Sequence, residues 1–460
     1  MQIGRKDLLW NYAATSMRIL SGIIVLPITL RMLPSEEMGI WSIFLSLITI
    51  TSLLDFGFSN SFSRNVTYVY SGVKELKTKG YVVAETSEVD YGLLRNLLFA
   101  MKRYYGILAL VFLFLFLVGS PFYMSSVLEQ YSGDKQIIWI TWYVFGALLA
   151  YELYTYYYNA ILTGRGLVKR NMQIVVVSQS IRIIVTLVFL LIGFGIISLV
   201  LGLFISDIIN RTLSHYAFYD KETKAKLKNA ESNSAWKTIK ILAPNSFKIG
   251  LIILSNFLRN QIIVIIAPFY LSLSQIAEYG ISKQIMALIT TIGMIWFHTF
   301  SVKMVQYRVK ADDWGIKRLY IKGQLSVLLV LMVGGCLFLL FGNDVLILIK
   351  SKTSLLCNNY LLLMLLFSLL ECSYSVANNT ILTKNEVPFF KAEIATGILS
   401  LVLLWLMLQF TKLGVLSLIL ATGIALCVYL NWKLPLWVAK EIKLKLKDYG
   451  FVIWSFFKNR

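Results

Sequence analysis

Charge is scarce in this 460-residue chain: only 15% of the residues are charged, whereas 57% are hydrophobic. A soluble domain carries roughly 25% charged residues, so the composition excludes a soluble protein and indicates a polytopic membrane protein. Histidine occurs twice and cysteine four times, without the spacing of a metal site. No P-loop, zinc motif or Ser/His/Asp arrangement is present. The sequence therefore predicts neither a metal site, nor a cofactor, nor an enzyme.

Long apolar runs occupy most of the chain. A spanning helix needs about 20 apolar residues, and the sequence offers such runs throughout its length. The predicted spans cover approximately residues 8–32, 38–60, 104–122, 138–162, 172–193, 196–216, 241–266, 277–301, 320–342, 356–382, 392–410 and 414–436. We therefore expect an all-α polytopic membrane protein with about twelve transmembrane helices.

The net charge of +20 follows the predicted topology. Alternate loops are rich and poor in Lys and Arg, and the poor side holds only Arg31, Lys135, Lys350, Lys352 and Lys412. By the positive-inside rule this alternation places both termini in the cytoplasm. The positive charge is thus explained by topology and by attraction to the bilayer surface, and we expect no nucleic-acid partner.

The segment around Arg18 recurs 241 residues later, around Arg259 (259 − 18 = 241). At the same offset Pro27 matches Pro268, and Leu47-Ile48-Thr49 matches Leu288-Ile289-Thr290. A second segment, Asn159–Thr163, recurs as Asn379–Thr383 at an offset of 220 (379 − 159 = 220). The chain is therefore predicted to hold two parallel six-helix lobes, related by a pseudo-twofold axis around a central cavity.

The two offsets differ by 241 − 220 = 21 residues, which predicts an insertion in the first lobe. The charged stretch at about 74–95 has the required length and is interpreted as a solvated cytoplasmic loop, with a partner-docking element as the alternative. The predicted organisation is an N-terminal lobe at 1–219, a cytoplasmic linker at 220–240, a C-terminal lobe at 241–436 and a basic tail at 437–460.

Six cations fall inside the predicted spans: Arg18, Arg182, Arg211, Lys248, Arg259 and Lys283. A cation at mid-bilayer costs about 2.5–3.5 kcal/mol on insertion scales, so each should face the protein interior, water or a partner. Arg18 and Arg259 lie near the middle of their spans, Lys248 toward the cytoplasmic end and Lys283 toward the outer end. We expect Arg18, Arg259, Lys248 and Lys283, with Arg182 as a further candidate, to bind an anionic group such as phosphate.

Internal ion pairing is the alternative for these cations. Four acids fall inside the predicted spans, namely Asp55, Glu152, Asp207 and Glu371. Asp207 and Arg211 are spaced i, i+4 and are predicted to form a structural ion pair. Asp55 is a candidate either for pairing with Arg18 or for ion coupling. Even if every acid takes one partner, two cations stay without a neutralising charge.

Several motifs resemble those of the Wzx-type polysaccharide (O-antigen) flippases of the multidrug/oligosaccharidyl-lipid/polysaccharide (MOP) exporter superfamily. They are Leu30–Pro34, Glu37–Trp41, Asp55-Phe56-Gly57-Phe58 with Arg64, and Asn159–Gly166. The resemblance implies a MATE-like fold of two lobes around a central cavity in the bacterial inner membrane. It also implies export of undecaprenyl-pyrophosphate-linked oligosaccharide to the periplasmic leaflet by a monomer, alongside other polysaccharide-assembly membrane proteins.

Two other functions stay open at this point. One is an ion-coupled drug or metabolite antiporter of the same fold, and the other is a membrane glycan polymerase or ligase. The short outer loops, nearly free of His, Arg and acidic clusters, speak against the second. Whether Na⁺, H⁺ or the membrane potential drives transport is not encoded in any motif of the chain.

Overall fold

The computed structural model describes residues 5–76, 88–230, 235–309, 312–383 and 388–458, and all regular structure in this part is helical. The chain divides into two compact units, Met1–Leu254 and Ser255–Arg460, called unit 1 and unit 2 below. The division falls inside a continuous helix, later along the chain than the linker predicted at 220–240.

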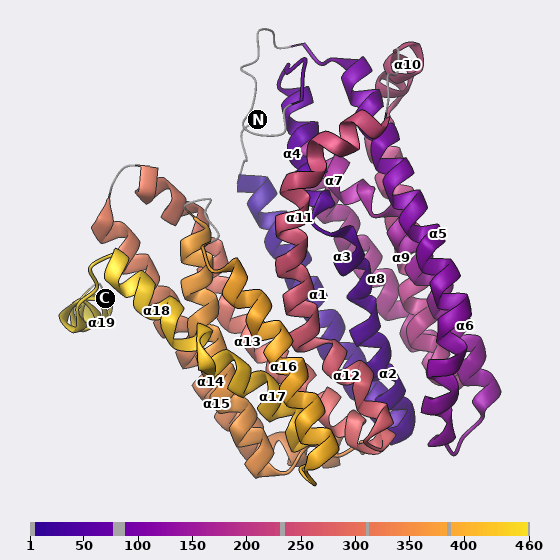
Figure 1. The fold of residues 1–460 in the computed structure, drawn as a ribbon, viewed down its shortest axis with the longest axis vertical. Coiled ribbons are helices and arrows are strands. Elements are labelled where there is room, and N and C mark those ends of the chain that lie inside the picture. Colours follow the sequence, from indigo (N-terminus) through magenta and orange to yellow (C-terminus); the bar gives the residue numbers. More distant parts are fainter. Residues whose placement is uncertain (1–4, 77–87, 231–234, 310–311, 384–387, 459–460) are drawn as a thin grey trace. The chain divides into compact units, whose positions relative to one another are not determined.

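Unit 1 consists of a series of long and short helices (Figure 1). They are α1 (Arg5–Met32), α2 (Ser35–Ile48), α3 (Ile50–Asp55), α4 (Phe58–Tyr70), α5 (Tyr91–Glu129), α6 (Lys135–Thr155), α7 (Tyr157–Gly164), α8 (Val168–Ile192), α9 (Ile197–Phe218), α10 (Lys221–Asn229) and most of α11 (Ala235–Asn260). Residues 77–87 of the insertion predicted at 74–95 lie outside the described residues, and α5 begins within the predicted range, at Tyr91.

Unit 2 contains the end of α11 and the remaining elements. They are α12 (Ile262–Ile266), the 3₁₀ turn η1 (Ala267–Phe269), α13 (Leu273–Val309), α14 (Asp313–Leu348), α15 (Asn358–Leu382), α16 (Phe390–Phe410), α17 (Leu416–Val428), α18 (Leu430–Glu441) and α19 (Leu446–Lys458).

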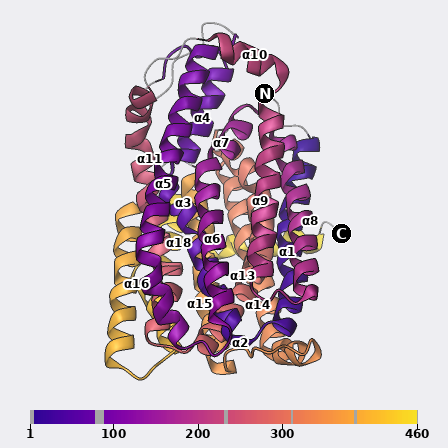
Figure 2. The ribbon, with the colours of Figure 1, turned by 90° about the vertical axis from the view of Figure 1, so that its right-hand side faces the viewer.

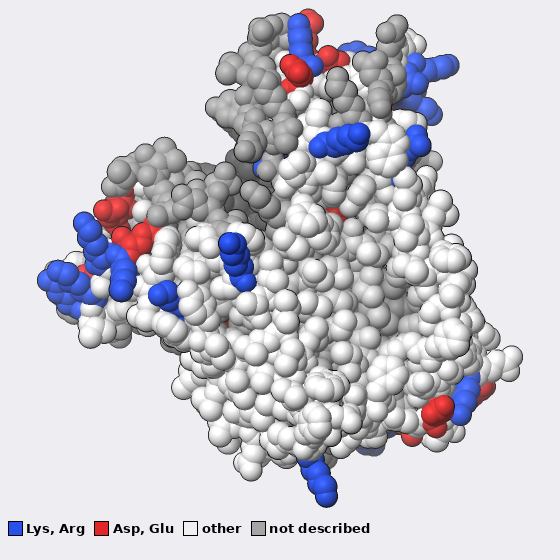
Figure 3. Space-filling model, viewed as in Figure 1, with Lys and Arg blue, Asp and Glu red and all other residues white. Residues whose placement is uncertain are grey.

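The number of membrane spans agrees with the sequence. In the described part, 11 helices are long and apolar enough to cross a membrane. The pair Gly250–Asn260 and Ile262–Phe269, bent by 45° at a short break, gives up to 12. This confirms the predicted all-α fold with about twelve spans. On the face drawn in Figure 3, most charged side chains lie toward the helix ends and the broad middle is uncharged.

Helix ends follow from local sequence signals. The side chains of Asp90, Asp134, Asp220 and Asp312 cap the N-termini of α5, α6, α10 and α14 by accepting backbone N–H groups. Such caps satisfy donors that a helix start leaves unpaired. At the other end, α8 stops at Gly193, whose φ of 95° suits glycine. The turn that follows uses Gly195 (φ 62°), and the corresponding turn before α17 uses Gly414 (φ 56°).

The same kind of helix pairing recurs in both units. In unit 1, α8 packs against α1 on one side and α9 on another, and Figure 2 shows these three helices together. In unit 2, α16 packs against α17, and Ser255 at the start of the unit touches α16 at Gly397. A Cβ at Gly397 would lie 2.8 Å from Ser255 Oγ, so only glycine allows this approach.

Candidate functional site

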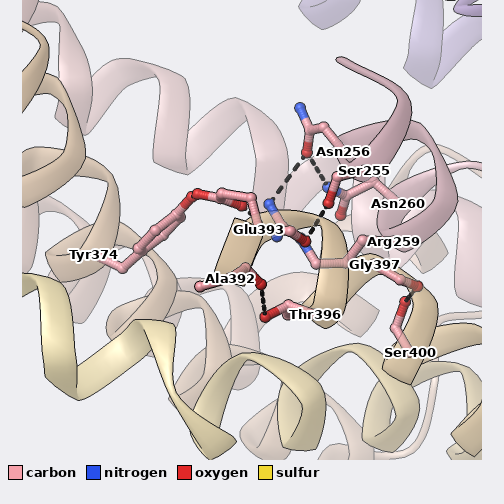
Figure 4. A network of polar contacts seen from close by, with 10 residues as sticks. All are labelled: Ser255, Asn256, Arg259, Asn260, Tyr374, Ala392, Glu393, Thr396, Gly397 and Ser400. Atoms are coloured by element: carbon pink, nitrogen blue, oxygen red, sulfur yellow. Dashed lines mark hydrogen bonds and ion pairs between the residues drawn. The ribbon is translucent and has the colours of Figure 1, made fainter. Parts of the chain in front are cut away.

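Arg259 lies in the last turn of α11 and is 4% exposed. Its Nη1 donates to Glu393 Oε2 at 3.1 Å, and its Nη2 donates to Asn256 Oδ1 at 3.3 Å (Figure 4). Glu393, on α16, is 6% exposed. The guanidinium of Arg259 is therefore neutralised inside unit 2 by a buried carboxylate.

Further contacts hold this ion pair in place. The hydroxyl of Tyr374, on α15, donates to Glu393 Oε1, and the Tyr374 ring lies 6.0 Å from the Arg259 guanidinium carbon. Ser255 Oγ donates to the backbone carbonyl of Glu393. Both carboxylate oxygens of Glu393 thus have a donor, as a buried charge requires. The arrangement is a structural network that ties α11, α15 and α16 together.

Arg18, the copy of Arg259 in the first half of the chain, has a different environment. It lies in the middle of α1 and is exposed. Within the described residues its guanidinium makes no hydrogen bond or ion pair. Its own helix carries a single acid, Asp7, at the opening turn, and the neighbouring α8 carries none.

The acid that neutralises Arg259 has no counterpart beside Arg18. The starts of α8 and α16, Val168 and Phe390, are 222 residues apart, so Glu393 corresponds to Asn171 on α8 (393 − 222 = 171). At the 220-residue offset of the preceding helices, Tyr374 corresponds to Tyr154, which is 48% exposed. The repeat thus retains the arginine and the tyrosine but replaces the carboxylate with an amide.

Arg182 is a second cation in unit 1, on the helix that packs against α1. This helix is α8, and Arg182 is half-buried. Its guanidinium, like that of Arg18, has no hydrogen-bonding or ionic partner among the residues that the structure describes. The packed pair α1 and α8 therefore carries two arginines within the membrane without a matching acid.

The other two candidate cations, Lys283 and Lys248, lie on helices other than α1 and α8. Lys283, on α13, donates from Nζ to the backbone carbonyl of Asn260 at 2.5 Å and lies over the ring of Tyr279. It faces a cavity inside unit 2. Lys248 lies on α11, and its side chain is outside the described part of the structure.

Asp55 closes the break between α3 and α4. It is 4% exposed, and its carboxylate accepts the backbone N–H of Ser59 at 2.9 Å and the hydroxyl of Tyr105. Phe56 (φ 49°) and Gly57 (φ 77°) are left-handed, so the carboxylate caps α4 across the turn. The pairing of Asp55 with Arg18 that the sequence left open is not present in the structure.

Asp207 and Arg211 are in contact on α9. Arg211 Nε lies 3.3 Å from Asp207 Oδ1, and the two side chains are 6% (Arg211) and 19% (Asp207) exposed. Glu152, on α6, is close enough to interact electrostatically with both. Two carboxylates thus share one arginine within unit 1. In the described part of the chain, no cluster of His, Cys, Asp and Glu is placed to hold a metal ion.

Glu393 is a residue of this site that the sequence pattern did not single out. It stands at the start of a predicted span and so does not count among the acids at the middle of the membrane. A signal was available: Glu393, Thr396, Gly397 and Ser400 recur at i, i+3, i+4 and i+7, and all four are buried on one face of α16. A stripe of small and polar residues of this kind indicates close helix packing around a polar group.

The fold as a whole is that of a known class of membrane proteins. An inward-facing multidrug resistance MATE-family transporter of the MOP superfamily matches this chain with a TM-score of 0.64 at 15% identity, over 96% of this chain and 95% of that one. The outward-facing conformation of such a transporter matches with a TM-score of 0.55 at 13% identity, over 95% of each chain. The chain therefore has a MATE-like fold.

A third structure is a MOP superfamily transporter from Pyrococcus furiosus, described as having a binding pocket of reversed polarity that suggests a different function. It matches with a TM-score of 0.53 at 13% identity, over 96% of this chain and 99% of that one. No protein-family model matches the sequence, and no curated protein matches it either. The similarity to solved structures thus concerns the fold.

Proposed function

We propose that the protein is a flippase that moves undecaprenyl-pyrophosphate-linked oligosaccharide from the cytoplasmic to the periplasmic leaflet by alternating access. The observation that supports this most strongly is the environment of Arg18. An arginine inside a span of a MATE-like fold is exposed and has no acidic partner within the described residues.

The physical reason is that an unpaired cation in a membrane span is costly, and an anionic ligand offsets the cost. A guanidinium can bind two phosphate oxygens through parallel N–H bonds, and this geometry suits a diphosphate. Arg182, on the packed helix α8, supplies a second charge for the same group. Arg259 is excluded from this role because Glu393 occupies it.

The remaining parts of the proposal come from the topology and the resemblance. The protein works as a monomer in the bacterial inner membrane, with both termini in the cytoplasm, alongside other polysaccharide-assembly membrane proteins. The diphosphate and sugars enter the protein while the lipid tail stays in the bilayer. Lys248 near the cytoplasmic end is proposed to attract the headgroup, and coupling to an ion or to the membrane potential would supply the energy.

A second candidate function is an ion-coupled drug antiporter of the same fold. The observation that favours it is the group formed by Glu152, Asp207 and Arg211, in which two carboxylates share one arginine. Such a group can bind a proton or a cation during transport. Asp55 is less suited to this role, because its carboxylate already accepts a backbone N–H and a tyrosine hydroxyl.

The test is made in the source cell, so that the repeat unit is the native one. The gene is deleted and replaced by the wild-type chain, by Arg18→Gln, or by the control Arg259→Gln/Glu393→Gln, which removes the neutral pair. Surface polysaccharide and inner-leaflet lipid-linked oligosaccharide are measured at matched membrane abundance. We expect Arg18→Gln to abolish surface polysaccharide and accumulate the lipid-linked form, and the control to retain export.

Two results would contradict the proposal. Unchanged polysaccharide in the deleted strain would exclude this substrate, and loss of resistance to cationic drugs would then favour the antiporter. Full export by Arg18→Gln would remove the anion-binding role of Arg18.

A further inference from the structure

Unit 2 encloses a cavity of its own, called the inner cavity here. Its volume is about 320 Å³, and its walls come from the end of α11 and from α13, α15 and α17. The polar part of the wall is mostly hydroxyl groups, those of Tyr279, Thr290, Thr291, Ser368, Ser375 and Thr422. The apolar part includes methionine, leucine and aromatic side chains. The inner cavity is thus both hydrogen-bonding and apolar.

A lysine and a carboxylate face this cavity. Lys283 is held by its hydrogen bond to the carbonyl of Asn260 at 2.5 Å, and Glu371 on α15 is close enough to interact with it electrostatically. Within the described residues no ion pair joins Lys283 to Glu371. Each of the two groups therefore has hydrogen-bonding capacity left for a molecule in the cavity.

An aromatic ring forms one wall of the cavity. Phe367 packs directly on the backbone of α17 at Gly423, where an added Cβ would lie 2.3 Å from the ring. This close contact fixes the position of the ring. A rigid aromatic face beside hydroxyl and charged groups matches a molecule that has an apolar face and a polar edge.

The cavity has room for an occupant much larger than a bare ion. A water molecule takes about 30 Å³ in the liquid, so 320 Å³ corresponds to many waters and reaches the lower end of the ~300–1,000 Å³ range of small-molecule sites. We propose that the inner cavity binds one sugar ring, with Lys283 and Glu371 hydrogen-bonded to its hydroxyls and Phe367 against its C–H face. The choice of a sugar rests on the proposed export of a lipid-linked oligosaccharide.

The two charges that face the inner cavity have no counterpart at the matching positions of unit 1. At the 241-residue offset Lys283 corresponds to Ser42, and at the 220-residue offset Glu371 corresponds to Tyr151. Neither charge is repeated in unit 1, where Arg18 and Arg182 lie. The two units therefore bind different parts of the substrate: unit 1 binds the diphosphate, and unit 2 selects the sugar.

The test measures sugar binding without transport. The full-length protein in lipid nanodiscs is mixed with the oligosaccharides released by mild acid from the surface polysaccharide of the source cell, and saturation-transfer NMR reports binding. We expect Glu371→Gln and Lys283→Met each to weaken binding at least about tenfold. Ala287→Phe, which adds bulk to the cavity wall and removes no polar group, is expected to abolish it. Lys412→Met, at an exposed lysine before α17 that does not line the cavity, is the matched control and is expected to bind sugar as the wild type does.

The outcomes are distinct from those of the export test. Binding that the cavity variants reduce and Lys412→Met does not would support the inference, even if export of the lipid-linked form failed. No binding by the wild-type protein, undiminished binding by Ala287→Phe, or binding of free amino acids in place of sugars would overturn it. The conclusion that export depends on Arg18 would be unaffected in that case.

Discussion

Arg18 and Arg259 occupy the same position in two copies of one repeat, yet only one of them is neutralised. Arg259 is buried and paired with Glu393 at 3.1 Å, under the ring of Tyr374. Arg18 is exposed, and its repeat has Asn171 in place of the glutamate. The cation is present in both units, but the charge that cancels it is present in one.

The difference indicates two separate uses of one residue. A buried arginine that keeps its carboxylate contributes to structure, because loss of either partner would leave a charge without compensation. An arginine without a carboxylate keeps its donors available for a ligand. A repeat that preserves residue type can therefore divide its roles between the copies, and the acids around each copy decide which role it takes.

The largest expected effect comes from breaking the pair in unit 2. Glu393→Gln would leave Arg259 buried without a counter-charge and is expected to lower the free energy of unfolding by about 3–5 kcal/mol. Arg18→Gln should change it by less than about 1 kcal/mol. Thermal unfolding of both variants in detergent, followed by tryptophan fluorescence, makes the comparison. Equal losses of unfolding free energy would show that both arginines have a structural role. The double variant Arg259→Gln/Glu393→Gln is expected to recover most of the stability.

A second prediction compares α9 and α17, the helices that follow the turns at Gly195 and Gly414. Gly202 on α9 corresponds to Ala421 on α17, because Gly195 and Gly414 fix an offset of 219 there. A Cβ at Gly202 would lie 2.0 Å from Thr186 Oγ1, so Gly202→Ala is expected to cost about 1–3 kcal/mol. Ala421→Gly should cost about 1 kcal/mol through backbone entropy alone. If Gly202→Ala left the free energy of unfolding unchanged in the same assay, α8 and α9 would be packed less closely than the 2.0 Å distance implies.

The third prediction concerns a variant that gives unit 1 the carboxylate that unit 2 has at Glu393. Asn171→Glu places a carboxylate at the position that Glu393 holds in the other repeat. We expect it to reduce polysaccharide export roughly tenfold, equivalent to about 1.4 kcal/mol, because the new charge competes with the substrate for an arginine. Asn171→Gln, which has the length of the glutamate side chain and no charge, is the control. Equal export by both variants would show that Asn171 does not belong to the anion site.

The smallest effect is expected at an ion pair outside the membrane. The backbone N–H of Thr223 and then Arg165 lower the pKa of Asp220 to about 2, from an ordinary value of 3.8. Its contribution to stability is present above pH 3.8 and is lost as the pH falls toward 2. Asp220→Asn should cost less than about 1 kcal/mol at pH 7. The difference from the wild type, measured by unfolding at several pH values, should vanish near pH 2.

Much of the fold could be predicted from the sequence, because apolar length and the loop charges determine the spans. The recurrence of residues around Arg18 and Arg259 predicts a repeated architecture from residue identities alone. The environments of these two residues could not be predicted, since they depend on which helix face meets which. Glu393 stands in the first turn of α16, and only tertiary packing places it beside Arg259. The 45° bend after Asn260 could not be predicted either, because no proline or glycine marks it.

The most direct test of the difference between the two arginines is binding of undecaprenyl pyrophosphate to the full-length protein in nanodiscs. The affinity of the wild type is compared with that of Arg18→Gln and of Arg259→Gln/Glu393→Gln. A free Arg18 predicts that Arg18→Gln weakens binding at least about tenfold, whereas the neutral-pair variant binds as the wild type does. Equal affinity of Arg18→Gln and the wild type, or a loss confined to the Arg259 variant, would contradict the assignment of the anion site to unit 1.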